Sequence, residues 1–169
     1  EKIKYFMVTY TDLFGVQRAK LVPASAISDM QKDGAGFASF ASWLDMTPAH
    51  PDMLAVPDSE SVIKLPWKKD VAWLASNCIM EGKLVEQAPR NVLNKAIDRA
   101  KKRNMRVKTG IEAEFFLLTP DGSAISDPYD NAEKPCYDQQ ALMRRYDVIA
   151  EICDYLGVLG WGPYQNDHE

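Results

Sequence analysis

The hydrophobic pattern changes its period near residue 87, and this change constrains the fold more than any other feature. Apolar and β-branched residues run from Ile3 to Tyr10 and again from Gln17 to Val22, on either side of a turn at Asp12 to Gly15. Two such runs around a short turn are typical of a β-hairpin. A helix from Ala24 to about Lys32 is expected to pack across the resulting sheet.

Prolines punctuate the rest of this first stretch, and the short segments between them can form further strands. Val62 to Leu65 and Val71 to Ile79 are two such segments, and they are able to pair with each other. The punctuating residues are Pro48, Pro51, Pro57 and Pro66. Residues 1–87 therefore predict a small, strand-rich sheet.

After residue 87 the apolar spacing becomes helical. Pro89 suits the first turn of a helix, because its missing N–H would lack a partner there anyway. The spacing predicts a helix over 89–103, and the basic residues at its end complement the helix dipole rather than form a nucleic-acid patch. A second helix is expected from an N-cap at Asp138, with an apolar stripe that ends at Gly157.

The segment RVKTGIEAEFFLL, residues 106–118, predicts a strand that ends at the turn TPDGS. Because strand side chains alternate, Glu112 and Glu114 share one face. Two unpaired carboxylates in an otherwise apolar strand are costly to bury. On the residues alone, two interpretations stay open: a solvent-facing acidic strand edge, or part of a site for Mg²⁺ or Mn²⁺, which prefer oxygen ligands.

Composition excludes several classes of protein. A net charge of -4 gives no field that would attract nucleic acid or an anionic membrane. No apolar run approaches the ~20 residues of a membrane helix and no signal segment opens the chain, so a cytoplasmic protein is expected. The 3 cysteines form no CxxC pair and are expected to be reduced. The start at Glu1 and the stop after a polar cluster suggest an incompletely represented polypeptide.

Several segments resemble the glutamine synthetase family, in the family's own order and over essentially the whole chain. GIEAEFFLL resembles its Glu-x-Glu-Phe-Phe segment, TDLFG its first hairpin, and APRNVLNKAIDRA the helix that opens its catalytic domain. Asp33-Gly34 followed by PDMLAVPD resembles its Asp-Gly-Ser-Ser loop and Ser-Asp-Met...Pro-Asp segment. His168-Glu169 resembles a His-Glu pair that ends a strand. The likeness is closest to the branch of type III and γ-glutamylmethylamide synthetases.

This resemblance implies an α+β fold, with an N-terminal β-grasp domain at residues 1–87 and the start of a catalytic α+β domain at residues 88–169. It implies a homo-oligomer whose active sites lie between subunits. The implied reaction joins glutamate and ammonia to form glutamine, with ATP as a substrate and γ-glutamyl phosphate as the intermediate. The Arg and His residues that bind glutamate and the phosphoryl group are not visible in the sequence, so this portion alone is expected to be inactive.

The resemblance also assigns roles to single residues. It makes Glu112, Glu114 and Glu169 ligands of Mg²⁺ or Mn²⁺. It makes Asp33 a catalytic residue that helps to bind and deprotonate ammonium in a neighbouring subunit's site. Tyr164 falls where the family often carries an acidic residue that contacts the nucleotide, so it is the candidate for ATP binding, although its side chain departs from that pattern.

The stretch AGFASFASWLDMTPAH departs from the family most clearly, because it is longer and more apolar than the usual loop and has Ala35 and Gly36 in place of serines. It favours an alternative in which the acceptor is an alkylamine or polyamine. A non-catalytic structural relative is a further alternative. Trp43 within this stretch is expected either to pack locally or to contact a subunit interface or substrate. The acceptor, the oligomer number and any regulation cannot be read from the sequence.

Overall fold

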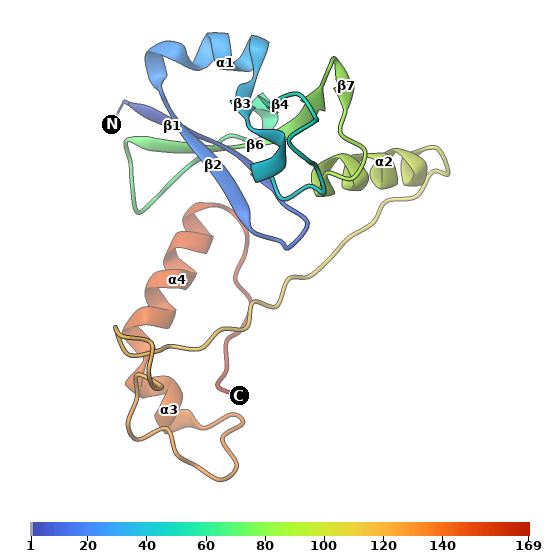
Figure 1. The fold of residues 1–169 in the computed structure, drawn as a ribbon. Coiled ribbons are helices and arrows are strands. Elements are labelled where there is room, and N and C mark those ends of the chain that lie inside the picture. The colour runs from blue at the N-terminus through green and yellow to red at the C-terminus, as the bar shows by residue number, and fades with distance from the viewer. Residues whose placement is uncertain (1) are drawn as a thin grey trace. The chain divides into compact units, whose positions relative to one another are not determined.

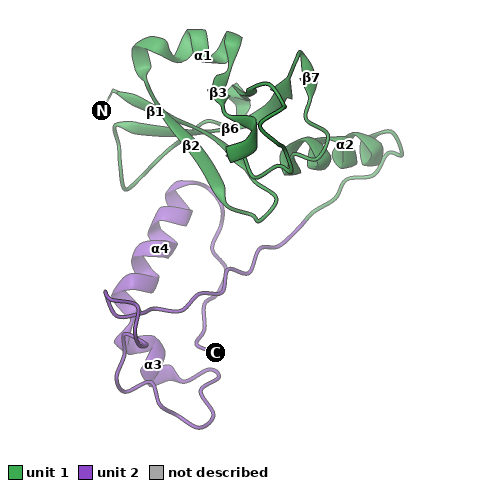
Figure 2. Ribbon diagram, viewed as in Figure 1, with its two compact units in different colours: residues 1–108 green, residues 109–169 purple. Residues whose placement is uncertain are grey.

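The computed structural model describes residues 2–169, and internal contacts divide them into two compact units (Figures 1 and 2). Unit 1 extends to Lys108, and unit 2 comprises Thr109–Glu169. Unit 1 contains the sheet and two helices, whereas unit 2 contains two helices and long stretches without regular structure. The predicted domain boundary near residue 87 stays a prediction.

The predicted hairpin is confirmed by β1 (Tyr5–Thr11) and β2 (Gln17–Pro23), which pair antiparallel. Its turn is organised by Asp12, whose side chain is buried and accepts hydrogen bonds from the N–H groups of Phe14 and Val16. The Arg18 guanidinium lies 2.7 Å from the same carboxylate. Burial alone would raise the pKa of Asp12, but the bonds from Val16, Arg18 and Phe14 outweigh it and lower that pKa.

The sheet is built around β6 (Val71–Met80), its longest strand. On one side β6 runs parallel to β1, and on the other it runs antiparallel to β4 (Met53–Pro57). The order is β2-β1-β6-β4-β3, with β3 at Ala35–Phe37. Two short strands, β5 (Ile63–Lys64) and β7 (Lys83–Leu84), also pair with β6. The predicted pairing of residues 62–65 with 71–79 is therefore confirmed.

The core of unit 1 lies beneath α1 (Ile27–Asp33), which follows a short 3-10 turn, η1 (Ala24–Ala26). Ile27 and Met30 of this helix pack against the core, so the predicted helix at 24–32 is confirmed. Two further 3-10 turns, η2 (Ser39–Ala41) and η3 (Ser59–Ser61), flank β4. The buried members of this hydrophobic core are Val8, Tyr10, Val22, Ala35, Leu44, Met53, Ala55, Cys78, Val85 and Ala88.

The helix predicted at 89–103 is confirmed by α2 (Pro89–Lys101), which has its proline in the first turn. Asn91 attaches α2 to the sheet: its buried side-chain amide donates to the carbonyl oxygens of Cys78 at 2.8 Å and Val85 at 2.9 Å. The apolar residues Val92, Leu93 and Ile97 are instead exposed. The contact that holds α2 to unit 1 is therefore partly polar.

The strand predicted at residues 106–118 does not form, and this expectation is wrong for the structure. The segment has no regular secondary structure and is almost wholly exposed, and its one ladder contact is an isolated bridge between Leu118 and Ile125. A strand needs a neighbour to satisfy its N–H and C=O groups, and no strand pairs with 106–116 among residues 2–169. The following turn is confirmed, with Gly122 at φ 71° and its N–H bonded to the Thr119 carbonyl.

The helix predicted after Asp138 is two helices, α3 (Gln139–Arg144) and α4 (Tyr146–Val158). Asp138 is the N-cap, as expected, and accepts a hydrogen bond from the Gln140 N–H at 2.8 Å. The helix breaks because Arg145 leaves the helical region, at φ -116° and ψ 14°. The second helix, α4, ends one residue beyond Gly157, and Gly160 supplies the left-handed conformation at φ 72°.

Within residues 2–169, none of the helices is both long enough and apolar enough to span a lipid bilayer.

Candidate functional site

The predicted metal ligands Glu112, Glu114 and Glu169 all lie in unit 2 and are exposed. None of the three side chains makes an ion pair or hydrogen bond with the described residues, so their oxygens are available to a cation. Carboxylate oxygens fit Mg²⁺ or Mn²⁺ by their chemistry. Residues 2–169 nevertheless contain no cluster of three His, Cys, Asp or Glu side chains that would hold a metal ion. The ligand type therefore fits Mg²⁺ or Mn²⁺, whereas these ligands do not form a complete metal site within residues 2–169.

Asp33 is the last residue of α1 in unit 1, and its side chain is exposed. The glycine after it fixes this end of the helix. Gly34 adopts φ 82° and ψ 160°, and its N–H donates to the Met30 carbonyl at 2.8 Å. A Cβ at Gly34 would lie only 3.0 Å from the Leu54 Cβ on β4. The main chain next to Asp33 is thus pressed against the sheet.

Tyr164 lies near the end of unit 2 in a stretch without regular structure, and it is 94% exposed. Its proposed contact with a nucleotide stays a prediction.

Trp43 lies in the apolar loop at φ 56°, a conformation that is rare for residues with a side chain. Its ring meets Phe14 edge to face at 5.7 Å between centroids, and the Arg18 guanidinium lies over it at 5.7 Å. These contacts support the packing role. Contact of Trp43 with a partner or substrate stays a prediction.

A cluster that sequence reasoning missed surrounds His168, the residue before Glu169. The His168 Nε2 lies 2.9 Å from the Asp130 carboxylate, and its Nδ1 lies 2.9 Å from the Pro135 carbonyl oxygen. The bond to Asp130 raises the pKa of His168, the Pro135 carbonyl adds to this effect, and burial opposes it. Both partners are acceptors, so both ring nitrogens can donate when the ring is protonated, and a protonated ring has no lone pair for a metal.

The loop that meets His168 is itself held to α3. Asp127 is buried and accepts from the Arg144 Nε at 2.6 Å and from the Tyr129 N–H at 3.1 Å. The bond from Arg144 is the largest cause that lowers the pKa of Asp127. The Arg144 guanidinium also donates to the Tyr129 carbonyl at 3.3 Å. No local sequence pattern marks these pairs, because the partners are far apart along the chain.

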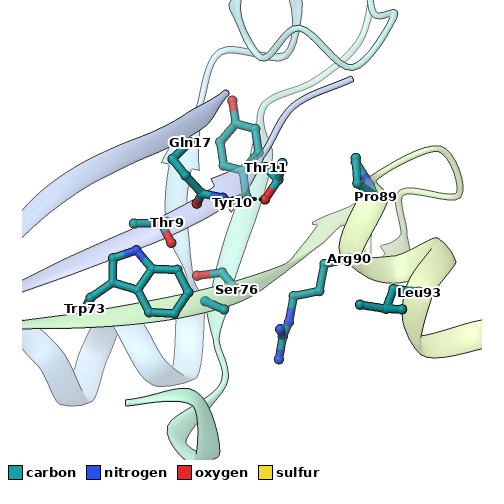
Figure 3. A pocket seen from close by; sticks show the side chains of 10 residues that line it. Thr9, Tyr10, Thr11, Gln17, Trp73, Ser76, Pro89, Arg90 and Leu93 are labelled. Carbon is teal, nitrogen blue, oxygen red and sulfur yellow. Dashed lines mark hydrogen bonds between the residues drawn. The ribbon is translucent and has the colours of Figure 1, made fainter. Parts of the chain in front are cut away.

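Unit 1 also has a cavity of about 200 Å³, formed by β1, β2, β6 and the first turns of α2 (Figure 3). Two of its polar side chains bond within the protein: Gln17 donates to Thr11 at 2.7 Å, and Arg90 pairs with Asp58. The buried Ser76 Oγ and Arg90 Nε have no hydrogen-bond partner among residues 2–169. The lining contains no Cys, His, Asp or Glu and none of the predicted site residues. It therefore offers no base or metal ligand.

Comparisons with known proteins give a consistent result. Residues 86–169 match the family described as "Glutamine synthetase, catalytic domain". A glutamine synthetase of Rhizobium leguminosarum bv. phaseoli is 72% identical over 169 residues, which cover 100% of this chain and 39% of the relative. A glutamate–methylamine ligase of Methyloversatilis universalis is 36% identical over 172 residues, covering 99% of this chain and 39% of the relative.

A solved structure of a GmaS/ADP complex has 62% sequence identity and a TM-score of 0.95, covering 99% of this chain and 39% of that chain. This chain thus spans about two fifths of the length of the proteins it matches. The α+β fold expected from the sequence is confirmed by this likeness. From the family match, the identity along the whole chain and the shared fold, the chain belongs to the glutamine synthetase family.

Proposed function

We propose that this chain supplies the first part of an ATP-dependent ligase that forms glutamine from glutamate and ammonia. The observation that carries the proposal is the 72% identity to a glutamine synthetase over the whole chain. The 169 aligned residues include the segment with Glu112 and Glu114 and also Glu169. Residues 1–87 would form the β-grasp domain, and residues 88–169 would open the catalytic domain.

The reaction consists of two transfers. ATP gives its terminal phosphoryl group to the γ-carboxylate of glutamate, which yields γ-glutamyl phosphate and ADP. Ammonia then attacks the γ-carbonyl carbon, the new C–N bond forms, and phosphate leaves with the electrons of the broken C–O bond. Asp33 is the proposed acceptor of the proton that bound ammonium loses to become ammonia. The attacking nitrogen loses a second proton as phosphate leaves.

Unpaired carboxylates are the chain's proposed contribution to metal binding. Glu112, Glu114 and Glu169 would hold Mg²⁺ or Mn²⁺ together with ligands from outside this chain. When bound, such an ion supplies positive charge that stabilises the phosphate oxygens during transfer. Tyr164 would lie beside the nucleotide, and Asp33 would act in a neighbouring subunit of a homo-oligomer.

The test measures phosphate release that depends on ATP, Mg²⁺ and glutamate, in a polypeptide of the relatives' length that includes this chain. Release is expected with ammonium, and no release with any amine would contradict the ligase. Glu114→Gln is expected to weaken metal binding and abolish turnover while the fold is kept. Unchanged activity in this variant would remove Glu114 from the metal site.

A second candidate has an alkylamine as the acceptor, and two likenesses favour it. The chain has 62% identity to the protein of the GmaS/ADP complex, at a TM-score of 0.95. It is also 36% identical to a glutamate–methylamine ligase. Comparing kcat/KM for ammonium, methylamine and ethanolamine in the same assay decides between the two candidates. A higher value for methylamine than for ammonium would replace the first proposal with the second.

A further inference from the structure

The backbone of His168 is held as firmly as its ring. Its carbonyl oxygen accepts a hydrogen bond from the Tyr137 N–H at 2.6 Å. Tyr137 itself adopts φ 65°, a strained conformation for a residue with a side chain. Two contacts to the ring and one to the carbonyl thus fix a single residue, and all three partners, Asp130, Pro135 and Tyr137, lie in one loop.

The fixed carbonyl belongs to the peptide bond that joins His168 to Glu169. A peptide bond is planar, so this carbonyl, the Glu169 nitrogen and the Glu169 Cα lie in one plane. The Tyr137 N–H and the two ring contacts therefore set the position of the Glu169 Cα. The Asp127–Arg144 ion pair, at 2.6 Å, ties the start of the same loop to α3.

We propose that Asp130 is a positioning residue, which orients the His168–Glu169 peptide through the His168 ring and so places the Glu169 carboxylate for a divalent metal. This inference rests on the metal role of Glu169 in the proposed function. Asp130 does not contact the metal. It acts as outer partners of metal ligands commonly do, by removing alternative orientations of the ligand.

The shape of the loop explains why this task falls to a charged residue. The carboxylate of Asp130 is about three quarters buried, with 23% of its side chain exposed, and the His168 side chain is 19% exposed. A charge-assisted hydrogen bond in such a partly dry place is stronger than a neutral one. No other carboxylate within residues 2–169 pairs with His168.

The matched variants are Asp130→Ala, which removes the acceptor, and Asp130→Asn, which keeps a neutral acceptor oxygen. Glu133→Ala is the control, because it removes an exposed carboxylate from the same loop that has no bond to His168. Each is made in a polypeptide of the relatives' length that includes this chain. Two quantities are measured: hydrogen exchange of the Tyr137 amide, and the dissociation constant for Mn²⁺ followed by electron paramagnetic resonance.

Asp130→Ala is expected to speed exchange of the Tyr137 amide about tenfold or more and to weaken Mn²⁺ binding by about 10- to 100-fold. Asp130→Asn, whose neutral oxygen is a weaker acceptor, should restore part of both, and Glu133→Ala should leave both unchanged. If Asp130→Ala fails to fold, His168→Gln gives the same comparison, because it removes both ring contacts and keeps the backbone carbonyl.

Only a joint change supports the proposal. Faster exchange with unchanged Mn²⁺ binding, weaker binding with unchanged exchange, or no change in either would overturn it. Glu169→Gln separates this inference from the proposed function. If Glu169→Gln binds Mn²⁺ like the wild type, the metal role of Glu169 itself fails. If Glu169→Gln weakens binding while Asp130→Ala does not, the metal role stands and the positioning role of Asp130 is overturned.

Discussion

Replacing Gly34 by alanine tests how the end of α1, and with it Asp33, is locked onto the sheet. At φ 82° and ψ 160° Gly34 occupies a region that is essentially closed to residues with a Cβ. Placing alanine there costs about 1–3 kcal/mol of folding free energy. The added Cβ would also lie 3.0 Å from the Leu54 Cβ and 3.4 Å from the Ala55 carbonyl oxygen. Neither atom is the end of a flexible side chain, so overpacking adds about 1–3 kcal/mol.

A small gain offsets part of this cost, because alanine lowers the entropy of the unfolded chain by about 0.4–1 kcal/mol in free energy. The net loss expected for Gly34→Ala is roughly 2–5 kcal/mol, a large share of the about 5–15 kcal/mol that stabilises an ordinary domain. Gly15→Ala is the control, since Gly15 has φ 80° but no atom within 4 Å of the added Cβ. It should lose only about 1 kcal/mol.

Urea unfolding followed by tryptophan fluorescence measures both losses. A Trp161→Phe background removes the tryptophan of unit 2. The signal then comes from Trp43, Trp67 and Trp73 of unit 1. If Gly34→Ala and Gly15→Ala lose the same free energy within about 0.5 kcal/mol, the close approach of Gly34 to β4 is not what holds the helix end.

Three further predictions concern unit 1. Asn91→Asp turns a buried donor into an acceptor that faces two carbonyl oxygens, so it should cost about 3–5 kcal/mol in urea unfolding. The same change at the exposed Asn104 should stay within about 0.5 kcal/mol, and equal losses would contradict the role of Asn91. Leu44→Ala empties a fully buried site and should cost about 2–5 kcal/mol by the same assay, whereas a loss below about 1 kcal/mol would contradict the packing. The third prediction concerns Asp12, whose pKa would be raised by burial but is lowered overall by its hydrogen bonds. The stability from its ionised form is therefore present above pH 3.8 and is lost as the pH falls through the folded-state pKa. Thermal melts should accordingly find Asp12→Asn less stable than the wild type at pH 7, with a gap that shrinks toward pH 3. A gap that does not change with pH would count against the ion pair with Arg18.

Local signals predicted most of unit 1 correctly. The β1–β2 hairpin follows from two apolar runs around a turn, and Pro89 marks the start of α2 within one residue. These elements depend on backbone preferences and on short-range spacing, both of which a single sequence contains. The fold class was implied by the resemblance to the glutamine synthetase family, and the separate strand-like and helical stretches of the chain are compatible with it.

The prediction for the segment at 106–118 was wrong because it rested on the alternation of side chains along a strand. That pattern does not indicate whether a neighbouring strand exists to pair with it. Its pattern is that of a strand, but within residues 2–169 no ladder forms along 106–117. The roles of Glu112 and Glu114 came from family resemblance and stay predictions. The structure puts both side chains in solvent rather than in a metal cluster.

Long-range polar pairs were out of reach for a different reason. Asp130 and His168 are 38 residues apart, and Asp127 and Arg144 are 17 apart. Neither pair has a spacing that strand or helix geometry would bring together. The break between α3 and α4 at Arg145 likewise has no proline or glycine to announce it.

The central place of β6 determines the order in which unit 1 can fold. β1 pairs with β6 in parallel, with Tyr5 opposite Val71. The sheet therefore cannot close until the chain has been synthesised past Val71. Contacts between such distant segments slow folding, because a large loop must close before they form. Before β6 emerges, a nascent chain would hold the β1–β2 hairpin and the β3–β4 pair as two separate pieces, and an isolated pair of strands is at best marginally stable in water. Because β4, β5 and β7 also pair with β6, the arrival of this one strand should complete the sheet in a single cooperative step.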